Sequence, residues 1–367
     1  MKKRQILVLL AALTLSLGIL ASLYALSPLS KQTQRASFER KFIDNPGAPG
    51  PVMDLGFNSF YIAGYSDSTI YFGNSTAPFH LFKTNLTLTD SQHVMLHVEL
   101  DSIRDPKRFR LSVEPPYFYL AHGTEPIILK GNFSDWTAHP FIEDGGYYFS
   151  EAVASGLGTF ALRSYSKLTK SYELAREISG DFKFHTDLLE KQLDGMFCVD
   201  GKLMFNRKLN EFVYLYFYRN QFIVTDTGLA LNYRGHTIDT FTHVRIKVAE
   251  IKEGKESMLS SPPMIVNGLS CTDGEFLYVQ SGLLAKNQDY RMFKVSITLD
   301  CYRLTDGIYV GSFHIPRYGK EDLMNFQVVN DRLFAVFGKH LITYHLNPLL
   351  LDKSSEQDLS IGLKTIN

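Results

Sequence analysis

The feature that most constrains the fold of this chain is a turn followed by an aromatic or aliphatic strand, which recurs along most of the sequence. The turns contain Asp, Asn, Gly or Pro, and Asp-Gly pairs suit hairpins because they tolerate positive φ. The copies lie at 66–73, 115–123, 143–150, 199–205, 272–279 and 329–336. A second strand and turn follow most copies, at 80–90, 127–136, 160–168, 222–235, 293–313 and 341–346. The recurrence predicts an all-β chain, and the 27 Phe and 20 Tyr suit strands.

Six such units over about 300 residues average roughly fifty residues each, which is the length of a propeller blade. The alternative is a β-sandwich, whose short strands would follow one another at even intervals without a larger repeat. We predict a β-propeller, with six blades favoured over five or seven. The run 52–57 would then supply the missing strand of the last blade and close the ring.

The N-terminus predicts a membrane helix. Three basic residues at 2–4 precede an uncharged run at 6–26, which is long enough to cross a hydrocarbon core of about 30 Å. A cleaved signal peptide has a shorter apolar stretch that ends at small residues, and cutting after Ala25 or Ser27 leaves a poor site. We predict an uncleaved signal-anchor, with a cleaved signal peptide as the alternative. The basic residues would stay cytoplasmic, so the rest would be periplasmic or on the cell surface.

The composition along the chain predicts four segments. Residues 1–30 would form the anchor, and the polar, Pro/Gly-ending stretch 31–51 would form a linker. Residues 52–350 would form the propeller domain, and 351–367 a polar C-terminal tail. Within the domain, the segment 181–193 (DFKFHTDLLEKQL) has apolar residues at helical spacing, which predicts a short helix between blades.

The turn-strand rhythm at 273–279, 305–313 and 326–345 resembles the NHL and YWTD-like six-bladed propellers. The stretch 61–82 (YIAGYSDSTIYFGNSTAPFHLF) is also similar to the opening blade of uncharacterised bacterial propellers with an N-terminal anchor. The resemblance covers most of 52–350 and rests on strand patterning and turns. It implies a fold and leaves the activity open, because no active-site motif of these families can be placed on this sequence.

Charge and cysteine content restrict the partners and the chemistry. Lys plus Arg and Asp plus Glu both total 38, which argues against a nucleic-acid partner. Cys198, Cys271 and Cys301 form no C-x-x-C pair, so they give no zinc or redox signal. A Cys271–Cys301 disulfide is one option in an oxidising compartment, and three buried free thiols are the favoured one.

Several residues are candidates for metal binding. His93 and His97 would present two metal ligands on a helix, but on a strand they belong to an ordinary polar face, which we favour. Lactonase-type propellers hold a divalent cation in the central channel with carboxylates and amides from several blades. The corresponding turn residues here are Asp67, Asp144, Asp200, Asp273 and Asp331. Bonding of each Asp to its local backbone is the favoured interpretation.

Other motifs are weaker. No G-x-S-x-G is present, and 155–159 (SGLGT) is interpreted as a strand-flanking turn rather than a phosphate-binding loop. Trp136, the single tryptophan, either packs between blades or stands at a binding face, and packing is favoured. The aromatic run 211–222 predicts a core strand. N-x-S/T sequons occur at Asn74, Asn85 and Asn132.

Two functional hypotheses follow, and no catalytic residue, metal ligand or cofactor is assigned by either. The favoured one is a membrane-anchored, extracytoplasmic propeller that acts as a binding or assembly module for another envelope protein. The alternative is a channel-centred hydrolase or lyase, metal-assisted or not, acting on an ester, a lactone or a sugar.

Overall fold

The computed structural model describes residues 3–26, 36–43, 49–100, 105–143, 146–156, 158–251 and 256–346. The predicted C-terminal tail, 351–367, lies outside these residues. Among them, one helix is long and apolar: α1 (Lys3–Leu26), none of whose residues is buried. Its length and composition suffice to cross a membrane, and a signal sequence would have the same features.

The regular secondary structure of the other described residues is almost entirely β-strand, as predicted. One sheet has nine strands in the order β5-β4-β3-β2-β7-β8-β9-β10-β6. Its strands are β2 (Phe60–Tyr65), β3 (Thr69–Asn74), β4 (His80–Asn85), β5 (Ser91–Met95), β6 (His97–Val98), β7 (Arg110–Glu114), β8 (Tyr117–His122), β9 (Ile127–Asn132) and β10 (Thr137–Ile142). A short 3₁₀ helix, η1 (Pro106–Arg108), precedes β7.

Four further sheets have four strands each. The first contains β11 (Phe149–Ala154), β12 (Thr159–Ser166), β13 (Ser171–Ile178) and β14 (Asp181–His185), and the second contains β15 (Gly201–Asn206), β16 (Glu211–Tyr216), β17 (Gln221–Thr225) and β18 (Leu231–His236). The third contains β21 (Asn267–Asp273), β22 (Phe276–Ser281), β23 (Ser296–Arg303) and β24 (Tyr309–Pro316). The fourth contains β25 (Leu323–Val329), β26 (Arg332–Phe337) and β27 (His340–His345) together with β1 (Pro49–Asp54). A hairpin, β19 (Val248–Ile251) and β20 (Glu256–Leu259), and helix α3 (Tyr290–Val295) interrupt this pattern.

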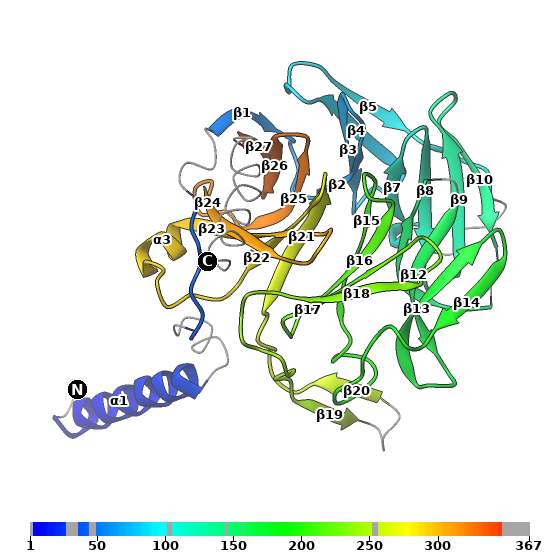
Figure 1. Ribbon diagram of the computed structural model, residues 1–367. Helices are drawn as coiled ribbons and strands as arrows, with labels where there is room; N and C mark the ends of the chain where they lie inside the picture. The colour runs from blue at the N-terminus through cyan, green and yellow to red at the C-terminus, as the bar shows by residue number, and fades with distance from the viewer. Residues whose placement is uncertain are drawn as a thin grey trace, which may run out of the picture.

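The nine-stranded sheet consists of two antiparallel runs, β2–β5 and β7–β10, that touch along their inner edges. β2 and β7 pair in parallel only at Gly64 and Val113. A Cβ on Gly64 would lie 2.1 Å from the Val113 carbonyl oxygen, so this approach requires glycine. Each run therefore matches the four-stranded sheets in strand order, and the sheets are arranged around a central axis (Figure 1).

The first and last strands of the described residues belong to one sheet. β1 pairs antiparallel with β27, with Val52 opposite Ile342 and Asp54 opposite His340. Figure 1 shows the blue β1 beside the orange-brown β27 and β26. The prediction that 52–57 adds a strand to the last sheet is confirmed, although β1 begins at Pro49 and ends at Asp54.

The predicted helix at 181–193 is wrong, because its first residues form strand β14 at the edge of a sheet. β14 pairs with β13 over Asp181–His185. Phe182 and Phe184 alternate with exposed residues, which is strand periodicity, and Phe182 stacks on Tyr147 with ring centroids 3.8 Å apart. Leu188 is buried after the strand has ended, so its helical spacing from Phe184 is a coincidence of the turn.

The apolar core lies between neighbouring sheets. One cluster joins side chains of β22, β23 and β24 to those of β25, β26 and β27, and similar clusters occur at other sheet junctions. Trp136 packs as predicted, with its ring 4.8 Å from that of Phe133. The aromatic run 211–222 contributes the buried strand β16.

All three cysteines are free and buried, which confirms the favoured prediction. Cys271 on β21 and Cys301 on β23 both pair with Tyr278 of the strand between them. Two strand spacings, about 9.5 Å in all, separate their backbones. That separation is too long for a disulfide.

Residues 36–43, which we call the stalk, pack along the sheet that contains β21–β24. The Arg40 side chain is fully buried and pairs with Asp300, with Nε 2.8 Å from Oδ1. Its guanidinium also donates to the Leu283 carbonyl and to the Gln288 and Ser281 side chains. Phe42 forms a parallel bridge with Ser312 of β24. The stalk is therefore fixed to the domain by a fully satisfied buried charge.

We expect Arg40→Ala to destabilise the domain by about 3–5 kcal/mol, because it leaves the Asp300 carboxylate buried without its cation. Arg108→Ala is the matched control, since its pair with Asp105 is largely exposed, and should cost less than about 1 kcal/mol. Denaturant unfolding of the full chain in detergent, followed by Trp136 fluorescence, measures both. Equal effects of the two substitutions would contradict the assigned role of Arg40.

Candidate functional site

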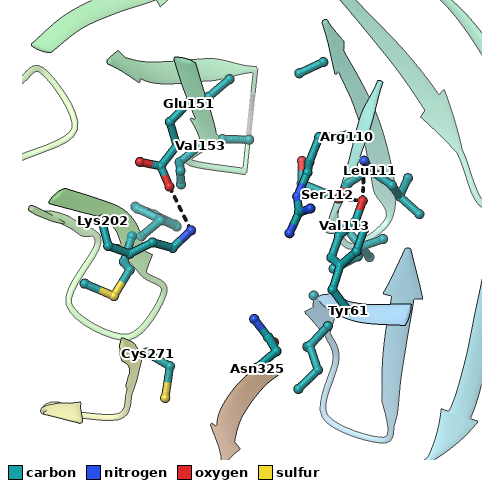
Figure 2. Close-up of a pocket in the computed structure, with 18 of the residues that line it drawn as sticks. Tyr61, Arg110, Leu111, Ser112, Val113, Glu151, Val153, Lys202, Cys271 and Asn325 are labelled. Carbon is teal, nitrogen blue, oxygen red and sulfur yellow. Dashed lines mark hydrogen bonds and ion pairs between the residues drawn. The ribbon is translucent and has the colours of Figure 1, made fainter. Parts of the chain in front are cut away.

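The inner strands of the sheets surround a central channel of about 650 Å³. β2, β7, β11, β15, β21 and β25 each contribute residues to its wall. Polar side chains project inward from most of these strands (Figure 2). A volume of this size is in the range of sites that hold small molecules or a segment of a partner.

One end of the channel, where the inner strands finish, is tied together by Arg207. Its Nε lies 2.8 Å from Glu114 Oε1, and its guanidinium donates to the carbonyls of Tyr65 and Val113. Arg207 follows β15, whereas its partners lie on β2 and β7 across the ring. The Tyr65 hydroxyl in turn donates to Asp273 Oδ1, at 3.3 Å. This network, which we call the Arg207 crosslink, joins inner strands of sheets that do not adjoin in sequence.

Burial perturbs the acids of this end. Desolvation raises the pKa of Asp273 to about 6, against the lowering effect of its hydrogen bond from Tyr65. Desolvation likewise raises the pKa of Glu114, although Arg207 acts in the opposite direction. Both acids are thus held in an environment that opposes their ionised forms.

The wall of the channel carries two further ion pairs. Lys202 Nζ lies 2.8 Å from Glu151 Oε1 (Figure 2), and Glu151 also accepts from the backbone N–H of Leu203. Arg163 lies 3.3 Å from Asp200 Oδ1 and donates to the Ser150 hydroxyl. The carboxylates of this described wall are therefore each engaged by a cation.

The other end of the channel, where the inner strands begin, is more exposed and presents Arg110. The Arg110 guanidinium lies 3.6 Å from the centroid of the Tyr61 ring. That ring is fixed because the Tyr61 hydroxyl accepts from the Leu111 N–H at 2.8 Å and donates to the Leu111 carbonyl. Arg110 is thus held by an aromatic face, whereas Arg163, Lys202 and Arg207 are held by carboxylates.

Ser112 and Asn325 accompany Arg110. Ser112 is two residues further along β7 and so projects from the same face of the strand, and Asn325 reaches into the channel from β25 (Figure 2). The Ser270 hydroxyl, also on the wall, is buried and has no hydrogen-bond partner among the described residues. These groups can donate hydrogen bonds to a ligand.

The charge of the lining is unbalanced. The chain as a whole has 38 basic and 38 acidic residues. The residues that line the channel include five cationic side chains, Arg108, Arg110, Arg163, Lys202 and Arg207, and three carboxylates, Glu114, Glu151 and Asp200. The channel therefore suits a group that is anionic or rich in hydrogen-bond acceptors.

The candidate aspartates do not converge on one metal site. Asp200 lines the channel and also accepts from the local Gly201 N–H, as predicted. Asp273 belongs to the Arg207 crosslink. Asp67 and Asp331 instead line a second cavity of about 350 Å³ at the junction of two sheets. Asp144 lies outside the described residues.

The two candidate histidines are separated as well. His93 is on β5 and stacks on His80, with Nδ1 2.9 Å from His80 Nε2. His97 begins β6, which pairs with β10 instead. Among the described residues, no group of three or more His, Cys, Asp or Glu side chains is arranged to hold a metal ion.

Two weaker motifs have structural roles. Ser155 and Gly156 follow β11 and Gly158 precedes β12, and the Ser155 N–H donates to the Thr159 carbonyl, as predicted for a strand-flanking turn. The Asn74 side chain is buried, and its oxygen accepts from the N–H groups of Thr76 and Ala77. The Asn74 side chain of that sequon is therefore engaged in hydrogen bonds within its own turn.

The sequence analysis missed Arg110, Glu114 and Arg207. The signal for the first two is the alternation in RLSVE at 110–114, where every second residue is polar within a strand. Such alternation is equally typical of a solvent-facing strand. Only the ring geometry shows that these polar faces point toward a channel.

Asp273 allows the stability of the channel end that holds the Arg207 crosslink to be tested by changing the pH. Its pKa is higher in the folded protein than its ordinary value of 3.8, so its contribution to stability decreases as pH rises through about 4 to 6. Asp273→Asn cannot ionise, so we expect the variant to gain about 1–3 kcal/mol relative to the wild type between pH 4 and pH 7.5. Unfolding at both pH values measures this, with the exposed Asp67→Asn as control. A difference that does not change with pH would contradict it.

No protein-family model and no curated protein sequence matches the chain. A solved structure of a DUF4221 family member from Bacteroides vulgatus is similar, with a TM-score of 0.51 and 12% identity over 86% of this chain and 99% of that one. Virginiamycin B lyase from Staphylococcus aureus aligns with a TM-score of 0.47 and 8% identity, over 81% of this chain and 99% of that one. YCF48 bound to the D1 peptide aligns with a TM-score of 0.44 and 11% identity, over 84% and 100%. At these identities the likeness concerns the fold alone: the chain has a β-propeller fold, and neither the NHL nor the YWTD type is singled out.

Proposed function

We propose that this protein is a membrane-anchored binding module, a six-bladed propeller whose channel docks a partner in the cell envelope. The number six follows from counting the two runs of the nine-stranded sheet as separate blades beside the four four-stranded sheets. The parallel contact at Gly64 and Val113 then corresponds to two neighbouring inner strands.

The anchor supports an envelope location. α1 is apolar from Ile6 onward and none of its residues is buried, as expected for a helix whose surroundings are lipid. With basic residues at 2–4 on the cytoplasmic side, the propeller would lie in the periplasm or at the cell surface. The three buried thiols are compatible with that compartment because Cys271 and Cys301 are too far apart to bond and Cys198 lies in a different core cluster.

The single observation that carries the binding proposal is the environment of the Arg110 side chain. It is an exposed cation at the open end of a preformed channel, fixed on the Tyr61 ring rather than on a carboxylate. Arginine recognises carboxylates and other planar oxyanions through paired hydrogen bonds. Ser112 and Asn325 add neutral donors beside it. The partner would therefore insert a carboxylate or a similar acceptor-rich group.

The alternative is a channel-centred hydrolase or lyase acting on an ester, a lactone or a sugar. Such an enzyme needs a group at the reacting end that exchanges a proton near neutral pH. The acid with a pKa near that range, Asp273, lies in the Arg207 crosslink at the opposite end from Arg110. We therefore rank this activity second.

Affinity capture of the full chain from its native membrane, followed by mass spectrometry, tests the binding proposal. We expect a stoichiometric partner with the wild type, and at least a tenfold loss of that partner with Arg110→Ala, because its anionic group would lose its counter-charge. Lys208→Ala is the control, since it removes an exposed cation at the other end of the channel. Equal recovery with all three proteins would refute the role of Arg110, and turnover of a small ester, lactone or sugar by the protein alone would favour the enzyme.

A further inference from the structure

The stalk is attached to one particular connection of the propeller, the one between β22 and β23. The Ala36 N–H donates to the Leu284 carbonyl at 2.8 Å, and the Lys286 N–H donates to the Phe38 carbonyl at 2.9 Å. Arg40 contacts Leu283 and Gln288 of the same connection through its guanidinium. On the other side, Gly311 leaves room for Ile43, whose side chain would lie 2.8 Å from a Cβ there.

The length of chain between the helix and the stalk limits how far this connection can be from the membrane. α1 ends at Leu26, and the stalk bonds to the domain from Ala36 onward. Ten residues span at most about 36 Å even when fully extended. The β22–β23 connection therefore lies within about 36 Å of the last residue of α1.

Helix α3 lies in this same connection and carries exposed apolar side chains. Tyr290, Met292 and Val295 are 39%, 47% and 61% exposed. Nearby Tyr318 is 38% exposed, and the Arg317 N–H beside it donates to the Val295 carbonyl. We call these four residues the α3 patch.

The patch is rigid, so its exposure is built into the fold. The side chain of the N-cap residue Asp289 accepts from the N–H groups of Arg291 and Met292. At the other end, the Ser296 hydroxyl donates to the Met292 carbonyl. The helix is held by both ends while none of its six residues is buried.

Basic residues accompany the apolar ones. Arg291 and Lys294 are on α3 itself, and the Lys294 ammonium lies 4.7 Å from the centroid of the Tyr290 ring. Tyr290 raises the pKa of Lys294, and Tyr24 in the last turn of α1 contributes in the same direction. Figure 1 likewise shows α1 on the same side of the molecule as α3. Tyrosine, aliphatic and basic side chains together are typical of segments that lie in the lipid headgroup region.

We propose that the α3 patch rests on the lipid headgroups and fixes the tilt of the propeller over the membrane. The proposal depends on α1 being the retained membrane anchor. β22 is antiparallel to β21 and runs back from the end of the channel that holds the Arg207 crosslink. Its connection to β23 therefore lies at the end where the inner strands begin. The exposed mouth with Arg110 is therefore on the face of the ring turned toward the bilayer. A partner would reach the channel from the membrane side.

A fluorescent label on a single introduced cysteine tests this arrangement, because the three native thiols are buried. Full-length Met292→Cys would be labelled and placed in nanodiscs of phosphatidylcholine and phosphatidylglycerol that contain nitroxide lipid. The matched control is Thr305→Cys, an exposed position beyond the far end of β23, an eight-residue strand that spans roughly 25 Å. Labelled wild type gives the background.

We expect the nitroxide lipid to quench the label at 292 at least threefold more than the label at 305. Equal quenching at both positions, with α1 shown to be present by intact mass, would overturn the orientation while leaving the anchor proposal intact. A mass that lacks α1 would overturn both. The label at 292 could also be quenched strongly in nanodiscs but not in native membranes to which the same nitroxide lipid has been added. That result would assign the patch to a protein partner and would also overturn the proposal.

Discussion

The pairing of β1 with β27 is the constraint on which the remaining structure depends. Residues near both ends of the described domain build one sheet, because the strand that precedes β2 of the first blade supplies the outer strand of the last one. The Arg207 crosslink needs this closure, because its partners lie on blades that meet only when the ring is complete. The stalk adds a second fastening just before β1, through the buried Arg40 and Asp300 pair. The attachment of the stalk, the closure of the ring and the geometry of the channel therefore depend on one another.

The charges of the channel follow from the strand pattern inside that ring. Inner strands turn polar residues toward the axis, as β7 does with Arg110, Ser112 and Glu114, which alternate with the buried Leu111 and Val113. Six such strands bring many charges into a small volume, where an unpaired charge is costly. Glu114, Glu151 and Asp200 are each paired within the channel. Arg110 stands apart because an aromatic ring and solvent stabilise it, which leaves its hydrogen-bonding edge available.

The sequence was sufficient for the fold class because turn chemistry and strand periodicity are local. It was insufficient to show where each copy of the turn-strand pattern lies relative to the inner strand of its sheet. The copies at 66–73, 115–123, 272–279 and 329–336 span the hairpin after an inner strand, whereas those at 143–150 and 199–205 lead into one. This difference, together with the β19–β20 hairpin, accounts for the uneven spacing. The strand at Asp181–His185 was missed because Phe182 and Phe184 lie at a sheet edge that only the paired β13 defines.

The site was less predictable than the fold for a related reason. Which polar face of a strand turns inward depends on ring closure, and Arg207 is separated from its partners by 93 residues or more along the chain. Aspartates in turns drew attention because they are conspicuous in sequence, yet turns lie at the rims of a propeller. The same argument explains why α3 could not be recognised beforehand. Its exposed Tyr290, Met292 and Val295 resemble ordinary core residues until the structure shows that they face outward. In the proposed arrangement their position beside the stalk gives them a surface to meet, because a retained α1 would keep that side of the domain within reach of the bilayer.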